Sequence, residues 1–251
     1  VTLTIEDGVV VNGNGHSITV FGNFISLNAE LTTTTFNDVT FSFGSDPEAP
    51  GNIAINDAHI SNGYFLPATG NASYGNFSIS HSTFTDVSGF YIWYPTTNSA
   101  FTNNLFIGSQ GLSIGVRDAA LLIRNNTFFD AQVAIGGSST IAVWANYGDP
   151  EHISIIGNNF LEGLQAHLEL QVGYPTAKLY SFENYFLGYT LSDAEDAVLD
   201  AGDSLTRGAD ILLESHQSTP NLTAPPLPSV SVSPINGSSS EGTNQNTQVS
   251  F

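Results

Sequence analysis

The chain has 251 residues, which is enough to bury a substantial apolar core without disulfide bonds. Its formal net charge is -19 at pH 7 and it contains no cysteine, so the sequence excludes a disulfide framework, a thiolate nucleophile and a thiolate metal site. The negative charge repels phosphates and anionic polysaccharides, which argues against a nucleic-acid partner. Only 11% of the residues are charged, and the abundance of Asn, Ser, Thr and Gly favours turns and strands over helices.

The first element in chain order spans residues 7–20 and reads DGVVVNGNGHSITV. Its NGNGHSITV part half matches the calcium-binding nonapeptide repeat GGxGxDxUx. His16 stands where that repeat needs an aspartate ligand, and no tandem copy follows. A calcium-binding roll is therefore the weaker interpretation of this segment.

A six-residue window recurs along the middle of the chain. Its copies are INDAHI (55–60), ISHSTF (79–84), FTNNLF (101–106), IRNNTF (123–128), IIGNNF (155–160) and SFENYF (181–186). Each copy ends in an apolar anchor, and the anchors Ile60, Phe84, Phe106, Phe128, Phe160 and Phe186 are separated by 24, 22, 22, 32 and 26 residues. An earlier window, FNDVTF (36–41), fits this pattern loosely. A period in the low twenties with apolar anchors predicts a solenoid.

Two residues before the anchor, four consecutive copies carry asparagine: Asn104, Asn126, Asn158 and Asn184. Asparagine tolerates the left-handed backbone of a corner, and its amide can bond to the amides of the coils above and below. We therefore predict a stacked asparagine ladder. The column before it is polar and varied, which predicts a solvent-facing stripe that includes Asn125. Asn125 begins one of five Asn-x-Ser/Thr sequons, about the number that chance gives for this composition, so the sequons are no evidence of glycosylation.

The motifs NNLF, RNNTFF and GNNF at coil spacing, together with residues 7–20, resemble the pectin-lyase-like superfamily of right-handed parallel β-helices. The resemblance covers about residues 1–190 and implies an all-β, right-handed parallel β-helix. It leaves the function open, because the fold carries lyases, hydrolases, epimerases, phage tailspikes and non-catalytic adhesins.

The run FYIWYP (90–95) alternates in the manner of a strand. If Phe90, Ile92 and Tyr94 face the core, then Tyr91 and Trp93 project outward. Trp144 and Tyr147 lie on a predicted long loop that can come near them. Exposed aromatic rings stack on sugar rings or on apolar partner surfaces. The alternative interpretation is that these rings pack beneath the loop.

That loop, residues 137–152, lengthens one coil by about ten residues and is the best place for added chemistry. Its end, YGDPEH, resembles the Tyr-Gly-x-Asp-Pro-His motif of mannuronan C5-epimerases, which implies acid, base and charge-neutralising roles for Tyr147, Asp149 and His152. The run lacks one residue between Gly and Asp and has Glu151 inserted before His, changes that misplace the side chains. The alternative is a Gly-Asp-Pro turn that precedes a strand. A lyase needs a basic catalytic residue, and the chain has only four Lys and Arg residues.

After Tyr189 the composition of the sequence changes. Ser192 and Glu195 fit a capping box and Gly202 fits a helix stop, so we predict a helical or irregular cap over residues 191–217, closing the solenoid of residues 1–190. Residues 218–251 are rich in Pro, Ser, Gly and Asn and predict a linker or flexible tail. The carboxylates of the acidic run between residues 193 and 203 are of a type that can hold calcium, but the run lacks the order of a known calcium loop. A solvated helix face is the favoured interpretation, so neither a metal site nor a cofactor is predicted.

These features favour a non-enzymatic function: an adhesive or structural module of a larger surface protein, filament or matrix, with a polysaccharide or cell-surface glycan as its ligand. The alternative is an epimerase, lyase or phage-type depolymerase that works at residues 147–152. A third possibility is self-association through the solenoid ends or the tail. No apolar run is long enough for a transmembrane helix, and the start at Val1 suggests a piece of a larger product, so we expect an extracellular or cell-surface location.

Overall fold

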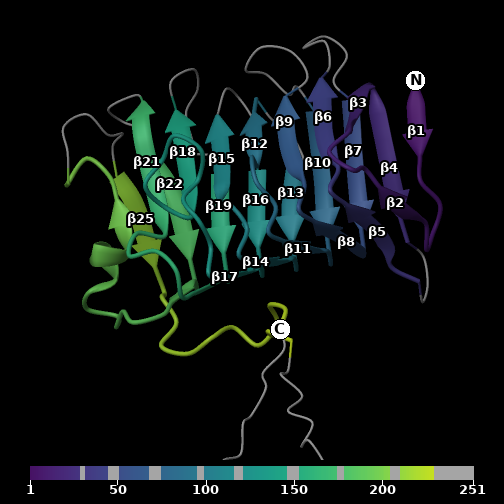
Figure 1. Cartoon of the computed structure of the whole chain (residues 1–251). Helices are drawn as coiled ribbons and strands as arrows, with labels where there is room; N and C mark the ends of the chain where they lie inside the picture. The colour runs from purple at the N-terminus through teal and green to yellow at the C-terminus, as the bar shows by residue number, and fades with distance from the viewer. Residues whose placement is uncertain are drawn as a thin grey trace, which may run out of the picture.

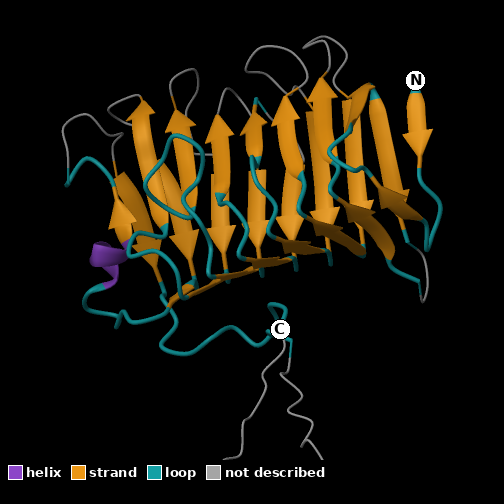
Figure 2. Cartoon of the chain, viewed as in Figure 1, coloured by secondary structure: helices purple, strands orange, loops and turns teal. Residues whose placement is uncertain are grey.

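Short parallel strands wind into a solenoid whose coils stack along one axis (Figure 1). The computed structural model describes residues 1–28, 32–44, 51–67, 75–94, 99–115, 121–145, 153–173, 178–203 and 210–228. Strands that lie one coil apart pair in parallel, and the helical content of these residues is limited to a single turn (Figure 2). The predicted all-β parallel solenoid is confirmed.

Each coil contributes one strand to each of three faces. The nine-stranded sheet contains, in spatial order, β1 (Thr2–Thr4), β4 (Asn23–Leu27), β7 (Gly51–Asn56), β10 (Gly75–Ser80), β13 (Ser99–Thr102), β16 (Leu121–Arg124), β19 (Ile153–Ile156), β22 (Lys178–Phe182) and β25 (Asp210–Glu214). The eight-stranded sheet contains β2 (Val10–Asn12), β5 (Thr34–Asn37), β8 (Ala58–Ser61), β11 (Thr83–Thr85), β14 (Leu105–Ile107), β17 (Thr127–Phe129), β20 (Asn159–Leu161) and β23 (Tyr185–Phe186).

The third face is divided between two sheets. The three-stranded sheet contains β3 (Ser17–Phe21), β6 (Thr40–Gly44) and β9 (Tyr64–Pro67). The five-stranded sheet contains β12 (Tyr91–Trp93), β15 (Leu112–Gly115), β18 (Ile141–Ala145), β21 (Leu168–Gly173) and β24 (Val198–Leu199). Strands β9 and β12 contact each other, so the two sheets follow one another along the axis.

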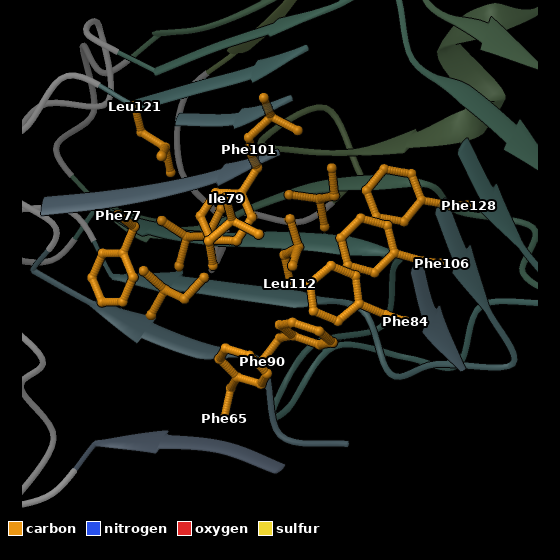
Figure 3. Close-up of a cluster of buried hydrophobic side chains, with 14 of the residues drawn as sticks. Phe65, Phe77, Ile79, Phe84, Phe90, Phe101, Phe106, Leu112, Leu121 and Phe128 are labelled. Atoms are coloured by element: carbon orange, nitrogen blue, oxygen red, sulfur yellow. The ribbon is translucent and has the colours of Figure 1, made fainter. Parts of the chain in front are cut away.

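The predicted anchors lie in the core and pair with one another from β8 to β23. The Phe84 and Phe106 ring centroids are 4.8 Å apart and those of Phe106 and Phe128 are 4.7 Å apart, with nearly parallel planes, as the row of rings in Figure 3 shows. The stack exists because the side chains of adjacent coils in register are only about 5 Å apart.

The early window FNDVTF spans a different corner of the coil from the later windows. Phe36 pairs with Ile60 and therefore occupies the anchor column, whereas Phe41 pairs with Phe65 in the three-stranded sheet. The coil has a second corner, at which Asp38 adopts a φ of 52° and the residue after it is buried. Both corners combine a polar left-handed residue, a buried residue directly after it and an apolar residue two positions further on, so the local sequence does not distinguish them.

The four ladder asparagines are buried and joined by side-chain hydrogen bonds from coil to coil. Nδ2 of Asn104 donates to Oδ1 of Asn126 (3.0 Å), Nδ2 of Asn126 donates to Oδ1 of Asn158 (2.9 Å), and Nδ2 of Asn158 donates to Oδ1 of Asn184 (2.9 Å). The ladder asparagines themselves do not adopt the left-handed conformation. It is adopted by the residue directly before each ladder position, namely Asp57, His81, Asn103, Asn125, Gly157 and Glu183. The ladder therefore fills the inside of the corner while its neighbours turn the chain.

Sheet pairing continues beyond residue 190, the predicted end of the solenoid. Strands β24 and β25 extend two sheets, and the helix between β23 and β24 is one 3-10 turn, Ala194–Ala197. The predicted capping box does not form: the N-cap is Asp193, no side chain caps the helix, and Ser192 instead contacts Thr190. The helix begins one residue later than the box requires, so Ser192 precedes the N-cap and Glu195 is the second helical residue instead of the third.

Residues 218–228, which we expected to begin a linker, lie along the outside of the eight-stranded sheet. Nδ2 of Asn159 donates to the Asn221 carbonyl (3.0 Å), and Oγ1 of Thr127 donates to the Pro225 carbonyl (2.6 Å). The chain thus turns back from β20 toward β17. Nδ2 of Asn221 donates to Oδ1 of Asn125 (3.1 Å). Both residues are the asparagines of Asn-x-Ser/Thr sequons, so the side chains that would carry glycans are hydrogen-bonded to each other.

Candidate functional site

The aromatic residues of β12 and β18 form one cluster on the outer face of the five-stranded sheet. Phe90 and Ile92 are buried, whereas Tyr91, Trp93 and Trp144 are half-buried and point outward. The rings of Tyr91 and Trp93 are nearly parallel, with centroids 5.0 Å apart, and Trp93 lies 6.0 Å from Trp144. We call Tyr91, Trp93 and Trp144 the aromatic cluster.

A glycine determines how the cluster packs. Trp93 pairs with Gly115, and Gly115 pairs with Trp144, so the glycine lies between the two indoles, one coil from each. A Cβ atom at Gly115 would lie 2.5 Å from Cδ2 of Trp93. The Trp93 ring therefore leans over the bare backbone of β15 toward Trp144, and its Nε1 is buried without an acceptor among the described residues.

We expect Gly115→Ala to push Trp93 away from the sheet, because the added methyl group overlaps its ring. The tryptophan emission should shift to longer wavelength, with a loss of about 1–3 kcal/mol in the free energy of unfolding. Gly202→Ala provides the comparison, because the nearest atom to its added Cβ is a carboxylate oxygen of Asp200 at 3.2 Å. This control should leave the emission unchanged, and an unshifted emission in Gly115→Ala would contradict the prediction.

Tyr94 does not face the core as the alternation predicted. It follows β12 with a φ of 59° and is half-buried, and its ring lies edge-on to Trp93 at 5.9 Å. A left-handed residue ends the strand, and with it the strict alternation of inward and outward side chains. The Tyr94 ring therefore lies at the edge of the aromatic cluster instead of in the core.

Beside the cluster, the outer face of the same sheet is covered by a loop. Ser113, Ala142 and Glu169 lie in one row from β15 to β21 and are fully buried although they point outward. The backbone N–H of Ser138 donates to Oε2 of Glu169 (2.7 Å), and Nε2 of Gln171 donates to its Oε1 (2.7 Å). The start of the loop therefore lies over this row, and a Cβ atom at Gly136 would lie 3.4 Å from Cζ2 of Trp144. Residues 146–152 lie outside the described residues, so the alternative that the aromatic rings pack beneath the loop stays a prediction.

The enzymatic alternative rests on residues that lie outside the described part of the chain: Tyr147, Asp149 and His152. Tyr147 is also one of the rings predicted to stack on a ligand, so that prediction is untested too. The structure therefore gives no geometry for them. Strand β18 carries Trp144 and ends at Ala145, so residues 146–152 follow directly after the aromatic cluster in the chain.

The acidic run that we considered for calcium has structural partners. Asp193 accepts hydrogen bonds from the backbone and hydroxyl of Thr190, and the hydroxyl contact contributes most to lowering its pKa. Oδ2 of Asp200 accepts from the Ile211 N–H (2.9 Å), and Oδ2 of Asp203 accepts from the Asp200 N–H (3.0 Å). Within the described ranges, no group of three or more His, Asp or Glu side chains is placed to hold a metal ion. Calcium binding by this run stays a hypothesis.

Two histidines near the C-terminal end, the buried His167 and the half-buried His216, were not singled out from the sequence. The ring of His167 is parallel to that of Phe186, 5.5 Å away, and its Nδ1 has no partner in the described part of the chain. Burial lowers the pKa of His167 to about 4. Burial also lowers the pKa of His216, whose ring lies 5.2 Å from Phe186. No motif marks either residue, because the contacts come from different coils.

A second outward aromatic pair was also missed. Tyr180 and Phe182 on β22 have parallel rings 5.9 Å apart and are half-buried on the outer face of the nine-stranded sheet. The signal was available in the alternating sequence KLYSF, whose buried positions are Leu179 and Ser181.

Comparison of the chain with protein-family models, with curated proteins and with solved structures found no match. Among the described residues, no helix is long and apolar enough to cross a membrane.

Proposed function

We propose that this chain is a non-catalytic glycan-binding β-solenoid of the pectin-lyase-like type, acting as an adhesive or structural module outside the cell. The observation that carries the proposal is the aromatic cluster. Tyr91, Trp93 and Trp144 come from strands two coils apart and meet on an outward surface rather than in the core. Aromatic faces held on a rigid sheet provide apolar contact area for the C–H faces of sugar rings.

The packing of the cluster restricts which rings a ligand can reach. Tyr91 covers one side of Trp93, and Nε1 of Trp93 is buried, so Trp93 mainly orients its neighbours. Tyr91 and Trp144 flank it and are the rings that we expect to contact a sugar. Burial raises the pKa of the Tyr91 hydroxyl, so this group stays protonated and can donate a hydrogen bond.

The charge of the protein selects among glycans. A net charge of -19 disfavours uronates and sulfated sugars, since no described basic side chain lies within the cluster. An uncharged polysaccharide avoids this repulsion. We therefore expect neutral glycans to bind and polyuronates to bind weakly or not at all.

Affinity electrophoresis and co-sedimentation against neutral polysaccharides and polyuronates test this proposal. Trp144→Ala should weaken binding of the neutral ligand by about tenfold, since it removes one stacking face. Trp93→Ala should weaken it as well, because Tyr91 and Trp144 lose the ring that holds them in place.

Tyr64→Ala is the matched control, because Tyr64 is 47% exposed on β9 but outside the cluster. It should bind as the wild type does. Retained binding in Trp144→Ala and Trp93→Ala, with folding intact, would contradict the proposal. Release of reducing ends or unsaturated products by the wild type, abolished by Asp149→Ala, would support the enzymatic alternative instead.

A further inference from the structure

The outer face of the nine-stranded sheet changes character toward its C-terminal end. From β16 to β25, one outward row consists of Leu122, Ser154, Tyr180 and Leu212, and the next consists of Arg124, Ile156, Phe182 and Glu214. The pairing between these strands is continuous, without a bulge. The six side chains of the two rows other than Arg124 and Glu214 are half-buried, and five of them are apolar or aromatic, which gives an apolar patch on a sheet surface.

Charged side chains stand at the two ends of the second row. Arg124 and Glu214 are exposed, and neither side chain has an ion pair or hydrogen bond with another described residue. Three strand spacings separate them, a distance of about 14 Å, so they cannot neutralise each other within one molecule. Arginine is rare in this chain, and this one stands beside the apolar patch rather than next to an acidic partner.

The order of residues in the two rows is self-complementary. Consider a second copy placed face to face with the first, related to it by a two-fold axis that runs parallel to the strands between β19 and β22. This axis reverses the order of the four strands, so that β16 faces β25 and β19 faces β22, and each row lies opposite the same row of the other copy. Arg124 then lies opposite Glu214 of the other copy, and Ile156 lies opposite Phe182. In the other row, Leu122 faces Leu212 and the hydroxyl of Ser154 faces that of Tyr180.

We propose that this face of the nine-stranded sheet is the interface of a two-fold symmetric homodimer. Two Arg124–Glu214 pairs close the ends of the interface, and the apolar rows fill its centre. An isologous interface of this kind requires the same patch to complement itself, which few arbitrary surfaces do. The outward positions from β16 to β22 in these rows carry no carboxylate, so this contact avoids most of the repulsion between two strongly acidic molecules.

The proposed interface is small, since four strands supply its centre. We therefore expect a reversible dimer of moderate affinity rather than a permanent one. The aromatic cluster lies on a different sheet, so dimerisation leaves it free and gives the assembly two such clusters. The dimer does not depend on the proposed glycan-binding function.

Sedimentation velocity over a wide range of loading concentrations tests the proposal with a charge swap. The wild type should dimerise. Arg124→Glu places two carboxylates opposite each other at each end and should weaken the dimer by about tenfold or more, as should Glu214→Arg through two facing arginines. The double variant Arg124→Glu, Glu214→Arg restores opposite charges and should regain the dimer.

Thr35→Glu combined with Thr83→Glu is the matched control, because it changes the net charge as much as Arg124→Glu does but on the outer face of the eight-stranded sheet. This variant should dimerise like the wild type. A monomeric wild type at all concentrations would overturn the proposal, and so would a dimer that ignores both single charge reversals. Circular dichroism of each variant verifies folding, and Phe182→Ser gives an uncharged second test that should also weaken the dimer.

Discussion

Asn126→Leu should lower the free energy of unfolding by about 3–5 kcal/mol, the largest loss that we expect from a single substitution in this chain. Leucine has nearly the same shape as asparagine, so the effect isolates the hydrogen bonds. Nδ2 of Asn126 donates to the Phe101 carbonyl (2.9 Å) and to Asn158, while its Oδ1 accepts from both the backbone N–H (2.9 Å) and the Nδ2 of Asn104. The substitution leaves these buried partners without their bonds, and each orphaned group costs about 1–3 kcal/mol.

Urea denaturation followed by far-ultraviolet circular dichroism measures this loss. Asn103→Gly is the control, because Asn103 turns the same kind of corner with a φ of 55° but lies outside the ladder. Glycine accepts that conformation, so the control should change the stability by only a few tenths of a kcal/mol. If the two variants unfolded at the same urea concentration, the ladder could not be an important source of stability.

Acidification should destabilise the protein through His167 between about pH 6.5 and pH 4. The pKa of this side chain is about 4 in the folded protein and 6.5 when it is exposed, so the unfolded state takes up a proton first as the pH falls. The contribution of neutral His167 to the free energy of unfolding is fully present above the unfolded pKa. It decreases as the pH falls from the unfolded pKa to the folded pKa. The difference in pKa corresponds to a loss of about 3 kcal/mol.

His167→Phe tests this prediction, because phenylalanine preserves the stack on Phe186 and cannot be protonated. The variant should lose less stability than the wild type between pH 7 and pH 4, by about 3 kcal/mol at the acidic end. Replacement of the exposed His59 by Gln provides the comparison and should keep the wild-type pH profile. An unchanged profile in His167→Phe would assign the acid sensitivity to other groups, of which His216 is the first to examine, since burial lowers its pKa too.

Much of the solenoid could be predicted from the sequence because its contacts recur. Each anchor packs on the anchor one coil away, and each ladder asparagine bonds to the next. The same contacts therefore recur in every coil, and the residues that make them recur in the sequence at the spacing of the coils. This periodicity predicts both the solenoid fold and the positions of the buried anchor residues. Periodicity does not identify the corner when two corners have the same local chemistry, which is why the window FNDVTF ends in Phe41 although Phe36 occupies the anchor column.

The candidate surfaces depended on the tertiary structure. The alternation in residues 90–95 predicted that Tyr91 and Trp93 point outward, but only the position of Gly115 on the intervening strand shows why Trp93 leans toward Trp144. The self-complementary rows of the nine-stranded sheet join residues from four coils of different lengths. The sequence by itself determined the repeating core, because neighbouring coils impose the same chemistry at each period. The register between coils, and therefore every surface that spans several of them, was decided only by the folded structure, since loops of unequal length separate the residues that it brings together.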